Sequence, residues 1–191
     1  MAKAALRSRV RAERRRRPPR QREDDASALA LMVAELPEVQ AASCVTLYAS
    51  LPGEPGTTPL RAALAEAGVR VLLPIVRPAG ILDWADDRGE LRAVDGLGGP
   101  EPTGPRLGEH APRQADVLLI PALAIDTLGH RLGQGAGYYD RVLAMIEPTV
   151  PVIALVHEDE LLDAAVEPVP VEAHDQPVHV VATPRRCLRL R

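Results

Sequence analysis

A chain of 191 residues, 46% of them hydrophobic and 26% charged, is long enough to bury the core of one globular domain and has a globular composition. The net charge of −3 hides an asymmetry, because residues 1–22 carry Lys3 and nine arginines against the single acid Glu13, a net +9, and the remainder carries −12. No apolar run approaches the roughly 20 residues of a membrane span, no secretory signal is recognisable, and the two cysteines match no disulfide or metal spacing, so we expect a soluble, cytoplasmic protein.

Two helices are predicted at the start of the chain. Strong helix formers run from Ala2 to about Arg17, where Pro18 and Pro19 stop the helix. Apolar residues at helical spacing over about 24–36 predict a second helix, which ends at Pro37.

A strand, a helix and a second strand are predicted next. The β-branched run 43–50 is typical of a buried strand, and a loop, LPGEPG, follows it. Thr58 before Pro59 is typical of a helix N-cap, and Gly68 lies just past the end of that helix. Residues 69–74 form the next predicted strand.

The second half of the chain alternates in the same way. Strands are predicted over 81–86, 115–121, 150–156 and 179–183, a long surface loop over 94–112, and a helix over 138–147 that is broken before Pro148.

Strands that alternate with helices predict an α/β fold, a three-layer sandwich with a mostly parallel open sheet and helices on both faces. We expect a single domain over residues 1–191, in which 1–22 form a basic N-terminal helix. In such sheets ligands bind beyond the carboxyl ends of the strands. The loops after 43–50 and 115–121, and the residues near 175, are therefore the places to look for a site.

The loop RLGQGAGYYD at 131–140 has glycines at every second position. Glycine permits positive φ angles and close approach of a ligand, so successive amides can line an anion-binding concavity. Arg131 beside the loop suits phosphate, and Asp140 suits a divalent cation that bridges phosphates. The spacing matches neither a P-loop nor the dinucleotide fingerprint, and a plain flexible turn accounts for it equally well.

Further candidate segments stand far apart in the sequence. Lys3 and Arg7 in KAALR share one helix face and suit triphosphate oxygens, although a charge run is usually a solvated face. Glu54 in LPGEPGTT follows a strand and suits a polar heterocycle, or is merely exposed. In EAHDQPVHVVAT, Asp175 suits a second metal-facing position, and His174 beside it is equally compatible with a surface residue.

In this order the segments resemble the 5-formyltetrahydrofolate cyclo-ligase family. ADVLLIPALAIDTLGHRLGQGAGYYDRVL is similar to the family's signature, KAALR to its N-terminal ATP-contacting motif, LPGEPGTTPL to its substrate loop and VEPVPVEAHDQPVHVVAT to its C-terminal segment. The resemblance runs from Lys3 to about Thr183. It is specific in the central motif, where length, glycine spacing, tyrosine pair and aspartate all agree. It implies an α/β sandwich with an open sheet.

The resemblance also implies a set of site residues. The ATP contacts would be Lys3, Ala4, Ala5, Leu6, Arg7, Arg131, Leu132, Gly133, Gln134, Gly135, Ala136, Gly137, Tyr138 and Tyr139. The folate contacts would be Ala49, Glu54, Gln134, Gly135, Ala136, Gly137 and Tyr138. The magnesium-facing carboxylates would be Asp140 and Asp175, and no general acid or base is assigned.

The implied reaction is the ATP- and Mg²⁺-dependent cyclisation of 5-formyltetrahydrofolate to 5,10-methenyltetrahydrofolate by a monomer that binds neither membrane nor nucleic acid. The chain departs from the family at Ile125, where an aromatic residue is frequent, and at Glu160, where glutamine is common. These departures bear on the pocket shape. The resemblance gives no role to the arginine cluster 14–17.

Three alternatives remain at this point. A nucleic-acid-binding protein would use RAERRRRPPRQR as a basic arm, although the acidic remainder and the lack of an aromatic stripe oppose it. A folate-binding homologue without turnover would keep the pocket, but intact Lys3, Arg131, Asp140 and Asp175 oppose it. An unrelated nucleotide-dependent kinase or ligase would make the loop around Glu54 a coincidence.

Overall fold

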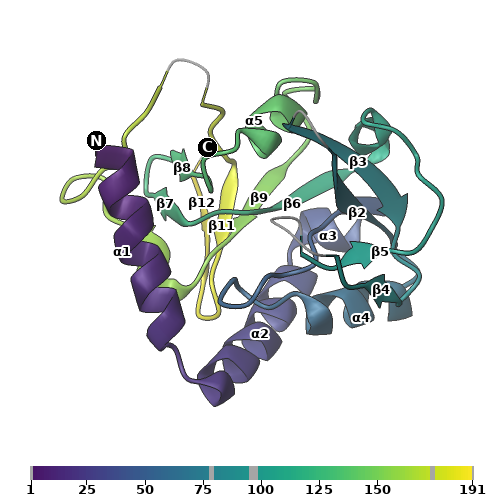
Figure 1. Ribbon diagram of the computed structural model, residues 1–191, viewed down its shortest axis with the longest axis horizontal. Coiled ribbons are helices and arrows are strands. Elements are labelled where there is room, and N and C mark those ends of the chain that lie inside the picture. The colour runs from purple at the N-terminus through teal and green to yellow at the C-terminus, as the bar shows by residue number, and fades with distance from the viewer. Residues whose placement is uncertain (1, 78–79, 95–98, 173–174, 191) are drawn as a thin grey trace.

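Figure 1 shows the computed structural model, which describes residues 2–77, 80–94, 99–172 and 175–190. Its helices are α1 (Ala2–Arg16), α2 (Pro19–Ala34), α3 (Pro37–Gln40), α4 (Thr58–Glu66) and α5 (Tyr138–Leu143), with short 3-10 helices at Ala111–Gln114 and Glu158–Glu160. Its strands are β1 (Cys44–Thr46), β2 (Arg70–Arg77), β3 (Ile81–Asp86), β4 (Leu91–Arg92), β5 (Glu101–Pro102), β6 (Val117–Pro121), β7 (Ala124–Asp126), β8 (Arg131–Leu132), β9 (Val152–Leu155), β10 (Leu161–Leu162), β11 (Val180–Ala182) and β12 (Cys187–Arg189). None of the helices described here has the length and apolar character that a membrane span requires.

Within the described residues the main sheet has seven strands in the order β12-β11-β9-β6-β1-β2-β3. The strands from β11 to β2 run parallel, and the edge strands β12 and β3 are antiparallel to their neighbours. This arrangement confirms the predicted α/β fold with a mostly parallel sheet.

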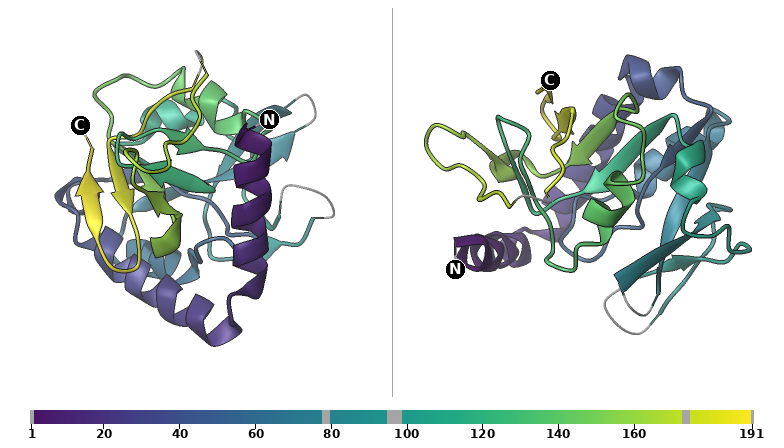
Figure 2. Two further views of the ribbon diagram at one scale, coloured as in Figure 1. Left: turned by 90° about the vertical axis from the view of Figure 1, so that its left-hand side faces the viewer. Right: turned by 90° about the horizontal axis from the view of Figure 1, so that it is seen from above.

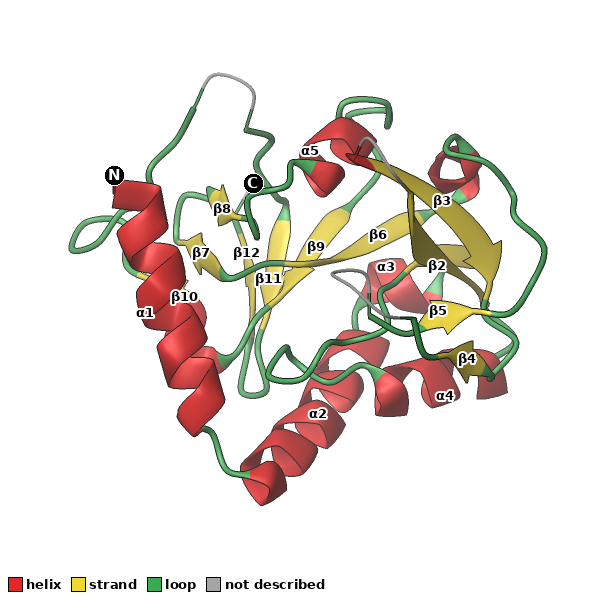
Figure 3. Cartoon of the chain, in the orientation of Figure 1, coloured by secondary structure: helices red, strands yellow, loops and turns green. Residues whose placement is uncertain are grey.

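Helices cover both faces of the main sheet (Figure 3). On one face α2, α3 and α4 pack against the sheet, and Leu29, Leu60 and the strand residue Leu119 belong to one hydrophobic core. On the other face α5 and the 3-10 helix at Ala111–Gln114 complete a second core that contains Leu118 and Trp84. The continuous apolar sequence of β6 agrees with this packing, because a strand that is covered on both faces buries side chains on both sides. The predicted three-layer sandwich is confirmed.

The predicted helix boundaries needed two corrections. Helix α2 begins at Pro19 and not near Asp24, since a proline at the first helical position loses no hydrogen bond. The N-cap of α4 is Thr57 and not Thr58, and its hydroxyl donates to the carbonyl oxygen of Tyr48 at 2.6 Å instead of capping the helix. Gly68 follows this helix with φ +74°, as predicted.

The strand at 43–50 is shorter than predicted, since β1 ends at Thr46, and α5 ends at Leu143. The segment 94–112 is not wholly a surface loop. Its residues Glu101 and Pro102 are buried in β5, which pairs with β4.

A second sheet, which the sequence did not predict, supports α1. In the part of the chain that is described it has the strand order β10-β7-β8. Leu6 and Val10 of α1 pack against its residues Leu132 and Leu162. The buried Asp126 organises this region, because its carboxylate accepts hydrogen bonds from the backbone amides of Leu128, His130 and Val169, each at 3.0 Å. Figures 1 and 2 show α1 on the opposite side of the molecule from β3.

The direction of chain travel across the main sheet reverses between β1 and β6. From β1 the chain continues to β2 and β3 on one side, whereas β6, β9 and β11 follow one another on the other side. The loops that leave β1 and β6 therefore diverge and leave a crevice at the carboxyl ends of these strands. This is the position at which open α/β sheets bind ligands.

Candidate active site

A cavity of about 620 Å³ lies at this reversal. The loop after β1, the glycine loop at 133–137 and helix α1 surround it, and the segment around Glu172 and Asp175 borders it. Its lining residues include Lys3, Arg7, Arg11, Tyr48, Ala49, Leu51, Glu54, Pro121, Arg131, Gly133, Gln134, Gly135, Ala136, Gly137, Tyr138, Tyr139, Asp140, Glu172 and Asp175. Segments distant in the sequence thus meet where the topology predicts a ligand.

The glycine loop needs its glycines for two physical reasons. Gly135 and Gly137 have φ angles of +107° and +68°, which side chains with a Cβ rarely adopt. A Cβ on Gly133 would lie 3.0 Å from an Nη atom of Arg131, so glycine also lets this guanidinium pack against the loop. The loop is therefore a defined structure and not a flexible turn.

The loop presents hydrogen-bond donors to the cavity. The backbone N–H groups of Gln134, Gly135 and Ala136 donate no hydrogen bond within the part of the chain that is described. Arg141 fixes the carbonyl side of the loop, since it donates to the oxygens of Ala136 and Gly80 at 2.9 Å. Free amides on a fixed loop suit an anion such as phosphate.

Two cations of α1 reach the same cavity. The Nζ atom of Lys3 lies 2.6 Å from Asp175 and 3.2 Å from Glu172. Burial alone would lower the pKa of Lys3, but these hydrogen bonds raise it above its ordinary value. Arg7 donates from Nε to the carbonyl oxygen of Gly133 at 2.9 Å. Helix α1 is therefore joined to both the glycine loop and the C-terminal segment.

Arg131 and Asp140 form an ion pair beneath the loop. The Nε atom of Arg131 and the hydroxyl of Tyr139 are both buried, and neither has a hydrogen-bond partner among the described residues. Buried polar groups are nearly always satisfied, so these two are available to a ligand. Asp140 and Asp175 both line the cavity, but among the described residues no group of three or more metal-binding side chains is present. Two carboxylates fit Mg²⁺ that is held partly by phosphate oxygens.

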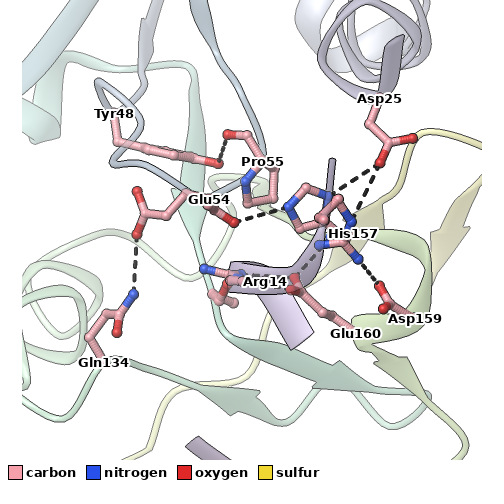
Figure 4. A network of polar contacts seen from close by, with 12 residues as sticks. Arg14, Asp25, Tyr48, Glu54, Pro55, Gln134, His157, Asp159 and Glu160 are labelled. Carbon is pink, nitrogen blue, oxygen red and sulfur yellow. Dashed lines mark hydrogen bonds and ion pairs between the residues drawn. The ribbon is translucent and has the colours of Figure 1, made fainter. Parts of the chain in front are cut away.

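Glu54 belongs to the loop after β1 and lines the main cavity, and its side chain points toward Gln134 (Figure 4). One carboxylate oxygen accepts from the backbone amide of Leu51 at 2.9 Å, and the other accepts from the side-chain amide of Gln134 at 3.2 Å. Burial raises the pKa of Glu54 above its ordinary value, and the hydrogen bond from Leu51 offsets part of this effect. A positioned carboxylate of this kind suits the N–H groups of a heterocycle.

Arg14 is not part of a solvated face, because it is 5% exposed and paired with Glu160 (Figure 4). Its Nε and Nη2 atoms lie 2.6 and 2.8 Å from the two carboxylate oxygens, and Nη2 also donates to the carbonyl oxygen of Ala122 at 2.6 Å. Arg17 pairs with Asp159 at 2.5 Å. These contacts attach α1 to the rest of the protein. Arg14 and Arg17 therefore have a structural role, and Glu160 is the ion-pair partner of Arg14.

His157 adjoins this pair and is held neutral. Burial lowers its pKa from 6.5 to about 4, and the positive charge of Arg17 acts in the same direction. The unfolded chain binds a proton here below about pH 6.5, whereas the folded protein does so only near pH 4. The contribution of neutral His157 to the free energy of unfolding is therefore fully present above about pH 6.5. It is lost as the pH falls toward about 4, and the total loss is about 3 kcal/mol.

We expect the variant His157→Gln to lack this loss. Urea unfolding at about pH 7 and about pH 4.5 would measure it, with the exposed His110→Gln as control. Equal pH dependence of the wild type and His157→Gln would contradict the assignment.

The structure brings together most of the residues predicted to form the site. All the predicted folate and metal residues line the cavity, and so do the ATP residues apart from Ala4, Ala5, Leu6 and Leu132. Leu6 and Leu132 are instead buried between α1 and the second sheet. His174 lies outside the described residues.

The sequence prediction omitted Arg11, Tyr48 and Glu172, which also line the cavity. Arg11 continues the four-residue spacing of Lys3 and Arg7, so helical periodicity would have found it. Tyr48 is buried and donates to the carbonyl oxygen of Pro55 at 3.0 Å, a contact with no local sequence signal.

Comparison with known proteins identifies the family of the chain. A model of the 5-formyltetrahydrofolate cyclo-ligase family matches residues 1–184. The chain is 41% identical to the 5-formyltetrahydrofolate cyclo-ligase of Mycolicibacterium smegmatis, over 97% of this chain and 95% of that one, and 33% identical to the enzyme of that name from Escherichia coli, over 93% and 97%.

A solved structure has the same fold. The 5,10-methenyltetrahydrofolate synthetase of Aquifex aeolicus superimposes with a TM-score of 0.82 at 28% identity, over 100% of this chain and 94% of that one. The family match spans nearly the whole chain and includes every segment that forms the cavity. The protein therefore belongs to the 5-formyltetrahydrofolate cyclo-ligase family, a family of ligases.

Proposed function

We propose that this protein cyclises 5-formyltetrahydrofolate to 5,10-methenyltetrahydrofolate with hydrolysis of ATP to ADP and phosphate. The observation that carries the proposal is the single cavity that joins free loop amides, the cations Lys3, Arg7 and Arg131, and the carboxylate of Glu54. The amides and cations suit a triphosphate, and the carboxylate suits a pterin. Family membership supports the same assignment.

The chemistry requires activation of an amide oxygen, which is a poor leaving group. The formyl oxygen attacks the γ-phosphorus of ATP, and ADP departs. N10 then attacks the formyl carbon and loses its proton, and the former formyl oxygen departs with phosphate. Phosphoryl transfer of this kind depends on positioning and on neutralisation of charge.

The residues of the chain supply those two requirements. Lys3, Arg7 and Arg131 neutralise phosphate oxygens, and the amides of 134–136 hold them in place. Glu54 orients the pterin, so that N10 and the formyl carbon lie next to the phosphate loop. Asp140 and Asp175 would hold Mg²⁺, which neutralises phosphate charge when bound.

The direct test is to mix the protein with Mg²⁺, ATP and 5-formyltetrahydrofolate and to follow the absorbance of the methenyl product in the near ultraviolet. We expect a rise that requires ATP. An active preparation of a homologous ligase under identical conditions is the control, and no ATP-dependent rise would remove the proposal.

Substituting Glu54 by glutamine is expected to raise the KM for the folate by about tenfold, because a hydrogen bond to a charged acceptor is lost. The KM for ATP should change little. Steady-state kinetics with each substrate varied in turn measures both constants, and the exposed Glu66→Gln is a matched control. An equal rise in both constants would exclude Glu54 as the pterin contact.

The variant Asp140→Asn is expected to weaken apparent Mg²⁺ affinity by about tenfold or more. Turnover should therefore fall most at limiting Mg²⁺ and recover in part when the concentration is raised. Titration of activity with Mg²⁺ makes the measurement. If the activity is reduced to the same extent at every Mg²⁺ concentration, Asp140 does not bind Mg²⁺ and serves only as the ion-pair partner of Arg131.

The alternative of a basic nucleic-acid-binding arm is less well supported. Arg9, Arg14, Arg17 and Arg20 have carboxylate partners at distances between 2.5 and 3.9 Å. Much of the arginine run is thus engaged within the protein and does not form an open arm.

A further inference from the structure

The loop that carries Glu54 is held by two buried side chains. The Nε2 atom of His157 lies 3.2 Å from the carbonyl oxygen of Gly53, and the hydroxyl of Tyr48 donates to the carbonyl oxygen of Pro55 at 3.0 Å (Figure 4). These two carbonyls belong to the residues on either side of Glu54. The carboxylate that the proposed function assigns to the pterin is therefore flanked by two backbone groups with fixed partners.

The backbone around Glu54 has little remaining freedom. The peptide group between Gly53 and Glu54 is planar, so one partner at its carbonyl oxygen and another at its N–H fix its orientation. His157 is the first partner, and the carbonyl oxygen of Leu51 is the second, at 3.0 Å. Pro55 fixes its own φ angle and restricts the residue before it. Gly53 has φ +90°, so the conformation that presents its carbonyl to His157 favours glycine.

Both partners are donors at neutral pH. Burial lowers the pKa of His157 to about 4, so its ring is neutral and carries one N–H group. That proton lies on Nε2, because the carbonyl of Gly53 can only accept, whereas Asp25 is 3.7 Å from Nδ1 and beyond hydrogen-bond distance. Burial raises the pKa of Tyr48 well above its ordinary value, so its hydroxyl keeps its proton.

His157 is itself fixed by the ion pair that attaches α1. Its backbone amide donates to a carboxylate oxygen of Glu160 at 2.9 Å, and Glu160 pairs with Arg14. A Cβ atom on Gly53 would lie 3.5 Å from the Cβ atom of Arg14, so α1 also packs against the loop. The imidazole therefore reaches the loop from a rigid position just after β9.

We propose that Tyr48 and His157 are positioning residues, which hold Glu54 in the orientation that binds the pterin. This inference rests on the proposed function, in which Glu54 is the pterin contact. Both side chains act through the backbone, because their donor atoms are engaged by the carbonyls of Gly53 and Pro55. A carboxylate that is oriented in advance loses less conformational freedom on binding, and a displacement of about 1 Å at such a site is costly.

Calorimetric titrations with 5-formyltetrahydrofolate and, separately, with ATP test the proposal. Tyr48→Phe keeps the ring and removes only the hydroxyl, and His157→Leu removes the donor. Each should weaken folate affinity by about three- to tenfold, the effect of one hydrogen bond, and leave ATP affinity unchanged. His157→Gln retains an amide N–H donor and should keep folate affinity within about twofold of the wild type.

Combination with Glu54→Gln distinguishes positioning from a general loss of structure. In the Glu54→Gln background, Tyr48→Phe should change folate affinity by less than about twofold, because side chains that act through one group are not additive. The control His179→Leu removes a histidine that accepts a hydrogen bond from the amide of Val152 at 3.0 Å, at the amino end of β9. This control should leave folate affinity unchanged.

The other outcomes overturn the proposal. They are unchanged folate affinity in both variants, an equal loss of folate and ATP affinity, and full additivity with Glu54→Gln. An effect in one variant alone overturns the proposal for the other residue. If His157→Leu does not fold in a urea titration, Tyr48→Phe decides, since it differs from the wild type by one oxygen atom.

The proposed function fails in a different way. Turnover does not enter the titrations, so folate that binds without forming the methenyl product refutes the reaction and leaves the positioning role standing. Unchanged folate affinity in Glu54→Gln overturns the positioning role, because there is then no pterin contact to position.

Discussion

Replacement of Lys3 by alanine is expected to lower kcat/KM for ATP by about 100- to 1,000-fold, the usual cost of removing one preorganised donor from a site of charge transfer. Lys3 is the first cation of α1, and its ammonium group lies in the cavity beside the glycine loop, 2.6 Å from Asp175. It lies near the start of α1, and its contacts with Asp175 and Glu172 are ion pairs, so the fold should be retained.

Steady-state kinetics with ATP varied measures kcat/KM, calorimetric titration measures ATP affinity, and thermal unfolding checks the fold. Lys3→Arg keeps the charge and should recover part of the loss, and Ser8→Ala, on an exposed position of the same helix, should have no effect. Unchanged ATP affinity in Lys3→Ala would refute the role of Lys3.

Replacement of Arg14 by alanine is expected to destabilise the protein by about 3–5 kcal/mol, because it leaves the carboxylate of Glu160 buried without its partner. Both side chains are almost fully buried, and they join α1 to the segment after β9. Since α1 also carries Lys3 and Arg7, its detachment should raise the KM for ATP as well.

Urea unfolding measures the loss in stability, with two comparisons. Arg14→Met/Glu160→Leu replaces the pair by apolar side chains and should recover most of the stability, since buried ion pairs contribute little over such replacements. Arg17→Ala removes a neighbouring cation whose partner Asp159 is more exposed, and should cost less. A loss below about 1 kcal/mol in Arg14→Ala would show that the pair does not hold α1.

Local sequence patterns predicted the main sheet well. The apolar run of β6, the proline and glycine that bound α4, and the alternation of strands with helices all act within a few residues. The hairpin of β7 and β8 was missed because its strands have two or three residues each, too few for a period to show. Helix α2 begins before the predicted start near residue 24, because Pro19 is compatible with a first helical turn.

The candidate site was predictable to the extent that its motifs are local. The glycine loop, Lys3 and Glu54 were found from short segments and from their resemblance to one family. The buried position of Arg14 could not be predicted from a short segment, because it depends on Glu160, which lies 146 residues away in the sequence. Arg11 continues the four-residue spacing of Lys3 and Arg7, but it lies within a charge run, which is usually a solvated face.

The attachment of α1 has a consequence for folding during synthesis. The side chain of Lys3 donates a hydrogen bond to Asp175, which lies 172 residues later in the sequence. Arg7 donates to the carbonyl oxygen of Gly133, which lies 126 residues later. Helix α1 is synthesised before both of these partners, so its cations remain exposed until the segment around Asp175 has been made. Contacts of such long sequence separation form slowly. A nascent chain can complete β1, β2 and β6 and still lack a closed active site, so competence for catalysis should be the last property that this protein acquires.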